Sequence, residues 1–199
     1  MINHKHKFIF IHIPKTGGTS IEKVFKKDVG GAFERERTIK YKHQNAKGMQ
    51  KLFPIEWGEY FKFALVRNPF DLLVSRYFWS RDAQQLESFK EKSFSEYIIA
   101  VNYHKLPEWT IPKCQYNYLS VNGEVAMDFI GRFENLQEDF NTIWDKIGIP
   151  RQEIPHVNKS KHKHYTEYYN EETKQIVAEK YAKDIEYFGY KFGELGNRI

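Results

Sequence analysis

Short apolar runs recur along the chain, and helical spacing of apolar residues appears between them. Phe8 to Ile13 is apolar apart from His12 and does not alternate with polar residues. Such a run predicts a parallel strand covered on both faces, because only a strand with one solvated face needs alternation. Runs at 61–66 and 125–134 predict two further strands, and 38–41 predicts a short one.

Helical spacing follows these runs, and residues that cap helices precede most of the helical segments. The predicted helices begin near Thr19 or Ser20, Asn45, Asn68, Asn135 and Asn170, and another covers Phe94 to Val101. Alternating strands and helices predict an α/β fold, a three-layer sandwich with a central, mostly parallel sheet flanked by helices. In such folds ligands bind at the carboxyl edge of the strands.

Composition narrows the class of protein. A chain of 199 residues is the size of one domain, 1–199, and its single cysteine excludes an intramolecular disulfide framework. No apolar run has the length of a membrane span or of a signal peptide, so we expect a cytoplasmic protein without membrane insertion. The 31 Lys and Arg against 26 Asp and Glu give a net charge of +5, which suits a nucleotide, an acidic glycan or nucleic acid.

The segment after the first strand has the features of an anion site. Gly17 and Gly18 permit a tight turn without side chains, and the helix that follows offers backbone N–H groups and a positive dipole end. Lys15 adds a positive charge. The lysine precedes the glycines, so the segment is not a Walker A loop, in which the lysine follows them. The alternative is an ordinary strand–turn–helix with a solvated lysine.

Two further positions lie near predicted strand ends. Arg67 directly follows the run 61–66 and can bind a phosphate with two hydrogen bonds, and Ser75 lies about two helical turns further on. Their alternative roles are a salt-bridge partner and a packing residue. His43 follows the short strand at 38–41; the alternative is a histidine on the surface or in the core.

The sequence also resembles a known family. Pro14 to Ser20 resembles the 5′-phosphosulfate loop of sulfotransferases that use 3′-phosphoadenosine 5′-phosphosulfate (PAPS), and Val66 to Tyr77 resembles their 3′-phosphate segment. The resemblance is closer to the carbohydrate (Golgi-type, sulfotransferase family 2) branch and its small bacterial members. It implies that the donor is bound by Lys15, Thr16, Gly17, Gly18, Thr19, Ser20, Arg67, Ser75, Lys159 and Ser160.

The resemblance further implies catalytic roles for Lys15 and for His43, the base. The phrase around Arg132 and Glu134 also resembles this branch, which places those two residues near the nucleotide; their alternative role is a structural ion pair. We therefore expect a sulfotransferase that moves a sulfuryl group from PAPS to an acceptor hydroxyl, leaving adenosine 3′,5′-bisphosphate.

This scheme requires no metal, and it makes no use of nucleic acid. The resemblance to the carbohydrate branch favours a glycan hydroxyl as the acceptor. The sequence leaves open a lipid, a small alcohol or a tyrosine as the acceptor instead. Two other functions also stay open. One is a P-loop-type kinase acting on a nucleotide or small molecule, and the other is a non-catalytic binder of acidic glycan or nucleic acid.

Overall fold

The computed structural model describes residues 1–28, 43–83, 91–103, 105–106, 111–155 and 162–194. They fall into two compact units: unit 1 from the described parts of Met1–Val66 and Gln115–Val157, and unit 2 from those of Arg67–Cys114 and Asn158–Leu195. The predicted strand at 38–41 and the binding residues Lys159 and Ser160 lie outside the described residues. None of the helices in the described ranges is long and apolar enough to cross a membrane.

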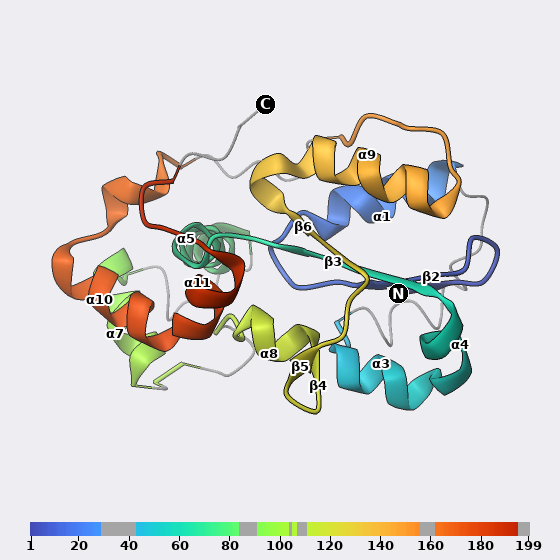
Figure 1. Ribbon diagram of the computed structural model, residues 1–199. Helices are drawn as coiled ribbons and strands as arrows, with labels where there is room; N and C mark the ends of the chain where they lie inside the picture. Colours follow the sequence, from blue (N-terminus) through green and yellow to red (C-terminus); the bar gives the residue numbers. More distant parts are fainter. Residues whose placement is uncertain (29–42, 84–90, 104, 107–110, 156–161, 195–199) are drawn as a thin grey trace. The chain divides into compact units, whose positions relative to one another are not determined.

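Unit 1 is built on a sheet with the strand order β1-β2-β3-β6 (Figure 1). The strands are β1 (Ile2–Asn3), β2 (Phe8–Ile11), β3 (Phe61–Val66) and β6 (Phe129–Arg132). The β2–β3 and β3–β6 pairs are parallel, and only β1 runs antiparallel, against β2. The prediction of a mostly parallel sheet flanked by helices is confirmed.

Helices cover both faces of this sheet. Figure 1 shows α1 and α9 on one side, and α3 and α4 on the other. The remaining elements of unit 1 are short: η3, a 3₁₀ turn, α8, and the hairpin β4–β5. The bounds are α1 (Gly18–Asp28), α3 (Ala46–Leu52), α4 (Pro54–Glu59), α8 (Gln115–Leu119), β4 (Ser120–Val121), β5 (Glu124–Val125), η3 (Phe133–Asn135) and α9 (Leu136–Ile147).

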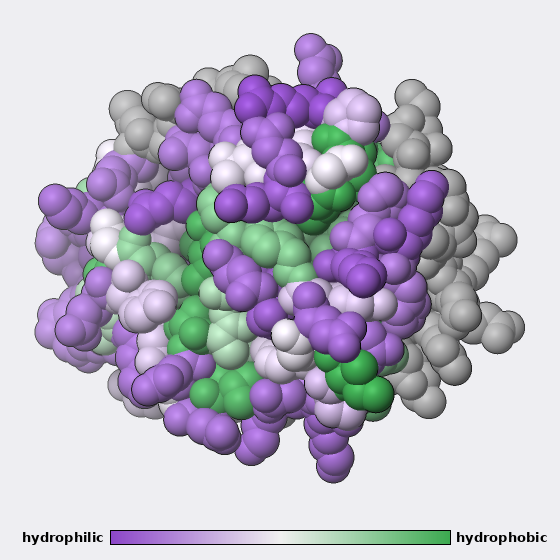
Figure 2. Space-filling view, turned by 45° about the vertical axis from the view of Figure 1, so that its right-hand side comes forward, coloured by the Kyte–Doolittle hydropathy of each residue, from purple (hydrophilic) through white to green (hydrophobic). Residues whose placement is uncertain are grey.

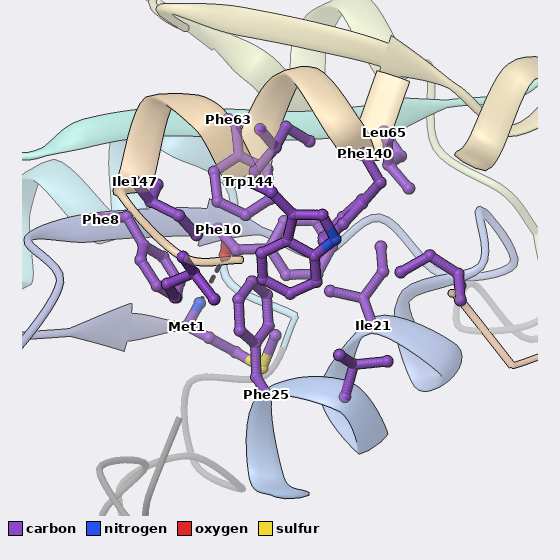
Figure 3. Close-up of a cluster of buried hydrophobic side chains, with 14 residues drawn as sticks. Met1, Phe8, Phe10, Ile21, Phe25, Phe63, Leu65, Phe140, Trp144 and Ile147 are labelled. Atoms are coloured by element: carbon purple, nitrogen blue, oxygen red, sulfur yellow. Dashed lines mark hydrogen bonds between the residues drawn. The ribbon is translucent and has the colours of Figure 1, made fainter. Parts of the chain in front are cut away.

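The core of unit 1 lies between the sheet and the helices α1 and α9 (Figure 3). Alternate residues of β2 and β3, such as Phe10 and Phe63, point to this side, and their rings stack at 5.0 Å between centroids. Phe25 of α1 meets Trp144 of α9 edge to face at 5.1 Å. Burial of each such side chain contributes about 1.5–3 kcal/mol, so this layer holds β2 and α1 rigidly on either side of the loop that joins them.

Unit 2 is helical within the described residues. Its core is formed by apolar and tyrosine side chains from α5, α7 and α10. A π-helical turn, η1, directly continues α5. The bounds are α5 (Pro69–Phe78), η1 (Trp79–Ala83), α7 (Phe94–Asn102), η4 (Tyr165–Tyr168), α10 (Glu171–Lys180) and α11 (Ala182–Phe188).

The surface fits the charged composition of the chain. Figure 2 shows a face that is mainly hydrophilic, with hydrophobic residues exposed in smaller areas between the polar ones. Four large hydrophobic residues of the described ranges are exposed: Leu52, Ile55, Tyr103 and Tyr187. Ala46 and Met49 of α3 are buried, whereas Leu52, the last residue of that helix, is 42% exposed.

Candidate functional site

The loop between β2 and α1 has an unusual backbone. Lys15 adopts φ +71° and Gly17 adopts φ +86°. A non-glycine residue in this left-handed region costs about 1–2 kcal/mol, and such residues are found disproportionately at ligand sites. The Thr16 hydroxyl donates to the Ile13 carbonyl at 2.9 Å and is buried, so the loop is closed by its own side chain.

Helix α1 begins at Gly18, whereas a cap at Thr19 or Ser20 would place the first helical residue at Ser20 or Ile21. The Gly17 carbonyl accepts from the amides of Ser20 at 3.0 Å and Ile21 at 3.4 Å. Thr19 and Ser20 therefore lie inside the first turn, and the prediction that one of them caps the helix is wrong. The first backbone N–H groups of a helix have no acceptor within that helix, and they carry the positive end of the helix dipole. Both properties favour the binding of an anion at this end.

Both glycines of the loop lie close to rings, that of the half-buried Phe133 and that of the buried His12. A Cβ on Gly17 would lie 3.2 Å from the Phe133 ring, and a Cβ on Gly18 would lie 2.1 Å from Nε2 of His12. Phe133 belongs to the η3 turn that follows β6, so the ends of β2 and β6 meet here, as parallel pairing through β3 requires. The glycines are needed because the space under the loop is already filled.

His43 lies next to this loop. Its Nδ1 is 3.2 Å from the His12 carbonyl oxygen, and the two imidazole rings are 4.7 Å apart between centroids. A carbonyl only accepts, so the Nδ1 of His43 carries the proton and Nε2 is the basic nitrogen of the neutral ring. The Tyr118 hydroxyl donates to the His43 carbonyl and fixes the main chain. His43 itself is exposed, so its ring is accessible to solvent.

A buried pair that the sequence analysis did not assign lies under the loop. His12 is 3% exposed and Glu22 of α1 is 6% exposed, and His12 Nδ1 is 2.9 Å from Glu22 Oε1. His12 interrupts an apolar run, and Glu22 faces inward from the second turn of α1. Those two departures from the apolar pattern were the available signal, but no sequence motif links them.

In unit 2, Arg67 is held by the first turn of α5. Its Nε and one terminal nitrogen donate to Asp71 Oδ2 at 3.0 and 2.9 Å, and both side chains are buried. Asn68 caps the helix by accepting from the Phe70 amide at 3.1 Å, as predicted, and Pro69 is the first helical residue. The salt-bridge role weighed for Arg67 is therefore real. A guanidinium has five N–H donors, so the pair with Asp71 is compatible with phosphate binding.

Ser75 is 3% exposed and lies one turn beyond Asp71 on α5. Residues four apart in a helix share a face, so Asp71 and Ser75 lie on the same face of α5. The ion pair with Asp71 therefore holds the Arg67 guanidinium at the face that carries Ser75. Unit 2 thus places Arg67 directly before α5, paired with Asp71, and Ser75 on the face of α5 that carries Asp71. Unit 1 gathers Lys15, the glycine turn and His43, with His12 between them.

The segment after β6 supports the loop in unit 1. The Arg132 amide donates to Asp139 Oδ2, and burial raises the pKa of this carboxyl, against the opposing effect of that hydrogen bond. Arg132 and Glu134 lie on either side of Phe133, the residue that contacts Gly17. Among the described residues, no group of three or more His, Cys, Asp or Glu side chains is placed to hold a metal ion.

The sulfotransferase family model matches residues 1–191, which is most of the chain. The chain belongs to the sulfotransferase family. The match runs through both compact units, and the prediction of one domain over 1–199 stays a prediction.

Two relatives of this sulfotransferase extend the comparison. It is 34% identical over 109 residues to an uncharacterized protein of Archaeoglobus fulgidus, covering 53% of this chain and 82% of that one. It is 23% identical over 183 residues to carbohydrate sulfotransferase 14 of Danio rerio, covering 76% of this chain and 48% of that protein. The chain thus spans about half the length of the Danio rerio relative.

A solved structure supports the fold of this sulfotransferase. Mouse sulfotransferase SULT7A1, complexed with PAP, superimposes with a TM-score of 0.60 at 12% identity, covering 98% of this chain and 88% of that one. The predicted P-loop-like α/β fold is therefore confirmed.

Proposed function

We propose that this protein transfers a sulfuryl group from PAPS to an acceptor hydroxyl, giving a sulfate ester and adenosine 3′,5′-bisphosphate. The observation that carries the proposal is the Lys15–Gly18 turn. It combines a positive charge, a left-handed backbone and a glycine cradle at the start of α1, in a chain of the sulfotransferase family.

The loop residues Thr16 to Ser20 would hold the 5′-phosphate through backbone N–H groups, and Lys15 would lie beside the bridging oxygen. The Thr16 hydroxyl already donates to Ile13, so this residue contributes its amide rather than its side chain. Sulfuryl transfer, like phosphoryl transfer, has a loose in-line transition state, so the residues act through position and charge. Lys15 would stabilise the negative charge that develops on the leaving oxygen.

For Arg67 and Ser75, the resemblance implies a role in binding the 3′-phosphate of PAPS. The Asp71 carboxylate fixes the guanidinium in advance, which lowers the entropy that binding has to remove. Lys159 and Ser160 remain proposals from the resemblance.

His43 would take the proton of the acceptor hydroxyl on Nε2 while the acceptor oxygen forms its bond to sulfur. The bond from sulfur to the bridging oxygen breaks in the same step, and its electron pair stays on the leaving phosphate. The His12 carbonyl keeps Nδ1 protonated, so the base has a defined tautomer throughout.

For the acceptor we propose a glycan hydroxyl. Support comes from the likeness to carbohydrate sulfotransferase 14 of Danio rerio and from the excess of basic residues, which suits an acidic polymer.

Replacing Arg67 by lysine tests the donor site. The variant keeps the charge beside Asp71 but loses the planar fork, so we expect adenosine 3′,5′-bisphosphate to bind about 10- to 50-fold more weakly, while 5′-AMP affinity changes little. Calorimetric titration without metal measures both. Arg151→Lys is the matched control, because Arg151 also pairs with an aspartate, Asp145, but on the exposed surface.

Three results would count against this function. Equal affinities for adenosine 3′,5′-bisphosphate, ADP and 5′-AMP would show that the protein has no site that recognises the 3′-phosphate. Binding of ATP that requires Mg²⁺ would favour a kinase. Glycan or nucleic-acid binding that falls steeply with salt and needs no nucleotide would favour a non-catalytic binder.

Replacing His43 by alanine tests the base. We expect the transfer rate at about pH 7 to fall about 100-fold, while bisphosphate affinity stays within about twofold, because the base acts on the acceptor. Labelled PAPS with a panel of glycan acceptors measures the rate. His4→Ala is the control, since His4 is exposed and its ring bonds to the Tyr60 hydroxyl. A full rate in the His43 variant would remove His43 from the mechanism.

A further inference from the structure

The buried pair His12–Glu22 contacts both parts of the candidate site in unit 1. The Nε2 edge of the His12 ring lies against the α-carbon of Gly18, the first residue of α1. Another side of the ring lies against His43, and Phe10 stacks on it with centroids 5.6 Å apart and planes 12° apart. His12 is thus placed between the anion loop, the candidate base and an apolar core residue.

The charge of this pair can take two values. Glu22 is buried in the second turn of α1, and its Oε1 is 2.9 Å from Nδ1 of the His12 ring. With a neutral imidazole 2.9 Å from the Glu22 carboxylate, the pair carries one negative charge. With an imidazolium the pair is neutral, and the second proton is on Nε2, the edge that faces Gly18. A histidine changes between these forms near neutral pH.

Two other titratable groups near the pair are uncharged near neutrality. Burial lowers the pKa of the Met1 amino group to about 5, against the opposing effect of Glu22, so that amine is uncharged at pH 7. Burial raises the pKa of Tyr118, whose hydroxyl meets the His43 carbonyl, to about 12, so it is neutral as well. Lys15 on the loop and the His43 ring also lie on the adjoining segments, as do Lys23 next to Glu22 and, beside Phe133, Arg132 and Glu134.

We propose that the His12–Glu22 pair takes up a proton when a nucleotide phosphate binds at the Lys15 loop, and so changes from a net negative to a neutral support beneath the anion. This inference rests on the proposed function, since it takes the loop as the phosphate site. An approaching anion favours the protonated form of a nearby histidine, and a buried imidazolium is tolerated only beside its carboxylate. His12 and Glu22 are then positioning residues, which act through Gly18 and not on the reacting atoms.

The experiment is calorimetric titration of adenosine 3′,5′-bisphosphate at about pH 7.5 in buffers of different ionisation enthalpy. The dependence of the observed heat on the buffer gives the number of protons taken up per ligand. We expect about half a proton in the wild type and close to none in His12→Gln, with Glu22→Gln also reduced. The phosphate groups of the ligand contribute the same number of protons in every variant. The difference in proton uptake between the wild type and a variant is therefore due to the His12–Glu22 pair.

His43→Gln is the matched control, because it removes the neighbouring histidine and leaves the buried pair intact. Uptake that persists in His12→Gln, or that disappears in His43→Gln alone, would overturn the inference. Failure of the wild type to bind the nucleotide would instead overturn the proposed function. If a single variant does not fold, His12→Phe combined with Glu22→Leu replaces the pair by apolar residues and is expected to show the same loss of uptake.

Discussion

Replacing Lys15 by asparagine is expected to lower the rate of sulfuryl transfer by about 1,000-fold, the scale seen when a preorganised group that stabilises developing charge is removed. Lys15 has φ +71°, and asparagine adopts this region more readily than other non-glycine residues. The variant therefore removes the charge without straining the loop, and its unfolding temperature should stay near that of the wild type. Transfer from labelled PAPS measures the rate, and calorimetry measures stability.

Lys7→Asn is a closely matched control for this variant. Lys7 also has a positive φ, +48°, but it precedes β2 whereas Lys15 follows that strand, so the two lie at opposite ends of β2. We expect the Lys7 variant to transfer at the wild-type rate. Equal rates in the two variants would mean that Lys15 does not act on the transferred group.

The Gly18→Ala variant is expected to lose about 3 kcal/mol of unfolding free energy, the upper end for overpacking in a core. The new methyl group would lie 2.1 Å from the His12 ring, which is itself confined by Glu22 and Phe10. Urea unfolding measures the loss. Gly58→Ala in α4 is the control, since a Cβ there meets nothing within 4 Å, and it should stabilise by about 0.5–1 kcal/mol.

A double-mutant cycle locates the cause of that loss. Combining Gly18→Ala with His12→Ala opens space for the methyl group, so the alanine at position 18 should cost much less in that background. An equal cost in both backgrounds would show that His12 is not the residue that excludes a side chain at position 18.

Sequence patterns predicted the elements whose residues carry a local signal. Strand β3 spans the predicted 61–66, and α9 ends at Ile147, followed by the glycine cap Gly148 with φ +67°. Strand β2 ends at Ile11, two residues before the predicted end, because its last partner on β3 is Ala64 and the chain then turns into the loop. The predicted strand at 125–134 is divided, and Asp128 at the break bonds to Lys62 on β3.

Tertiary contacts account for the rest. The helix predicted to begin near Asn170 is α10, and a second helix, α11, follows it after Tyr181, a buried residue whose hydroxyl donates to the Pro112 carbonyl. The two-residue strand β1 is too short for any periodic signal. The His12–Glu22 contact forms only when α1 folds back on β2, so two unusual residues in separate apolar patterns could not be joined from the sequence.

The closed loop between β2 and α1 has a consequence for the thermodynamics of association. Thr16 is bonded to Ile13, Gly17 is seated on Phe133 and Gly18 on His12, so this backbone keeps its shape without help from a guest molecule. A nucleotide then gives up its own translation and rotation but does not have to order the loop that receives it. The heat-capacity change of association should therefore be small, because little apolar surface is newly buried by folding around the guest.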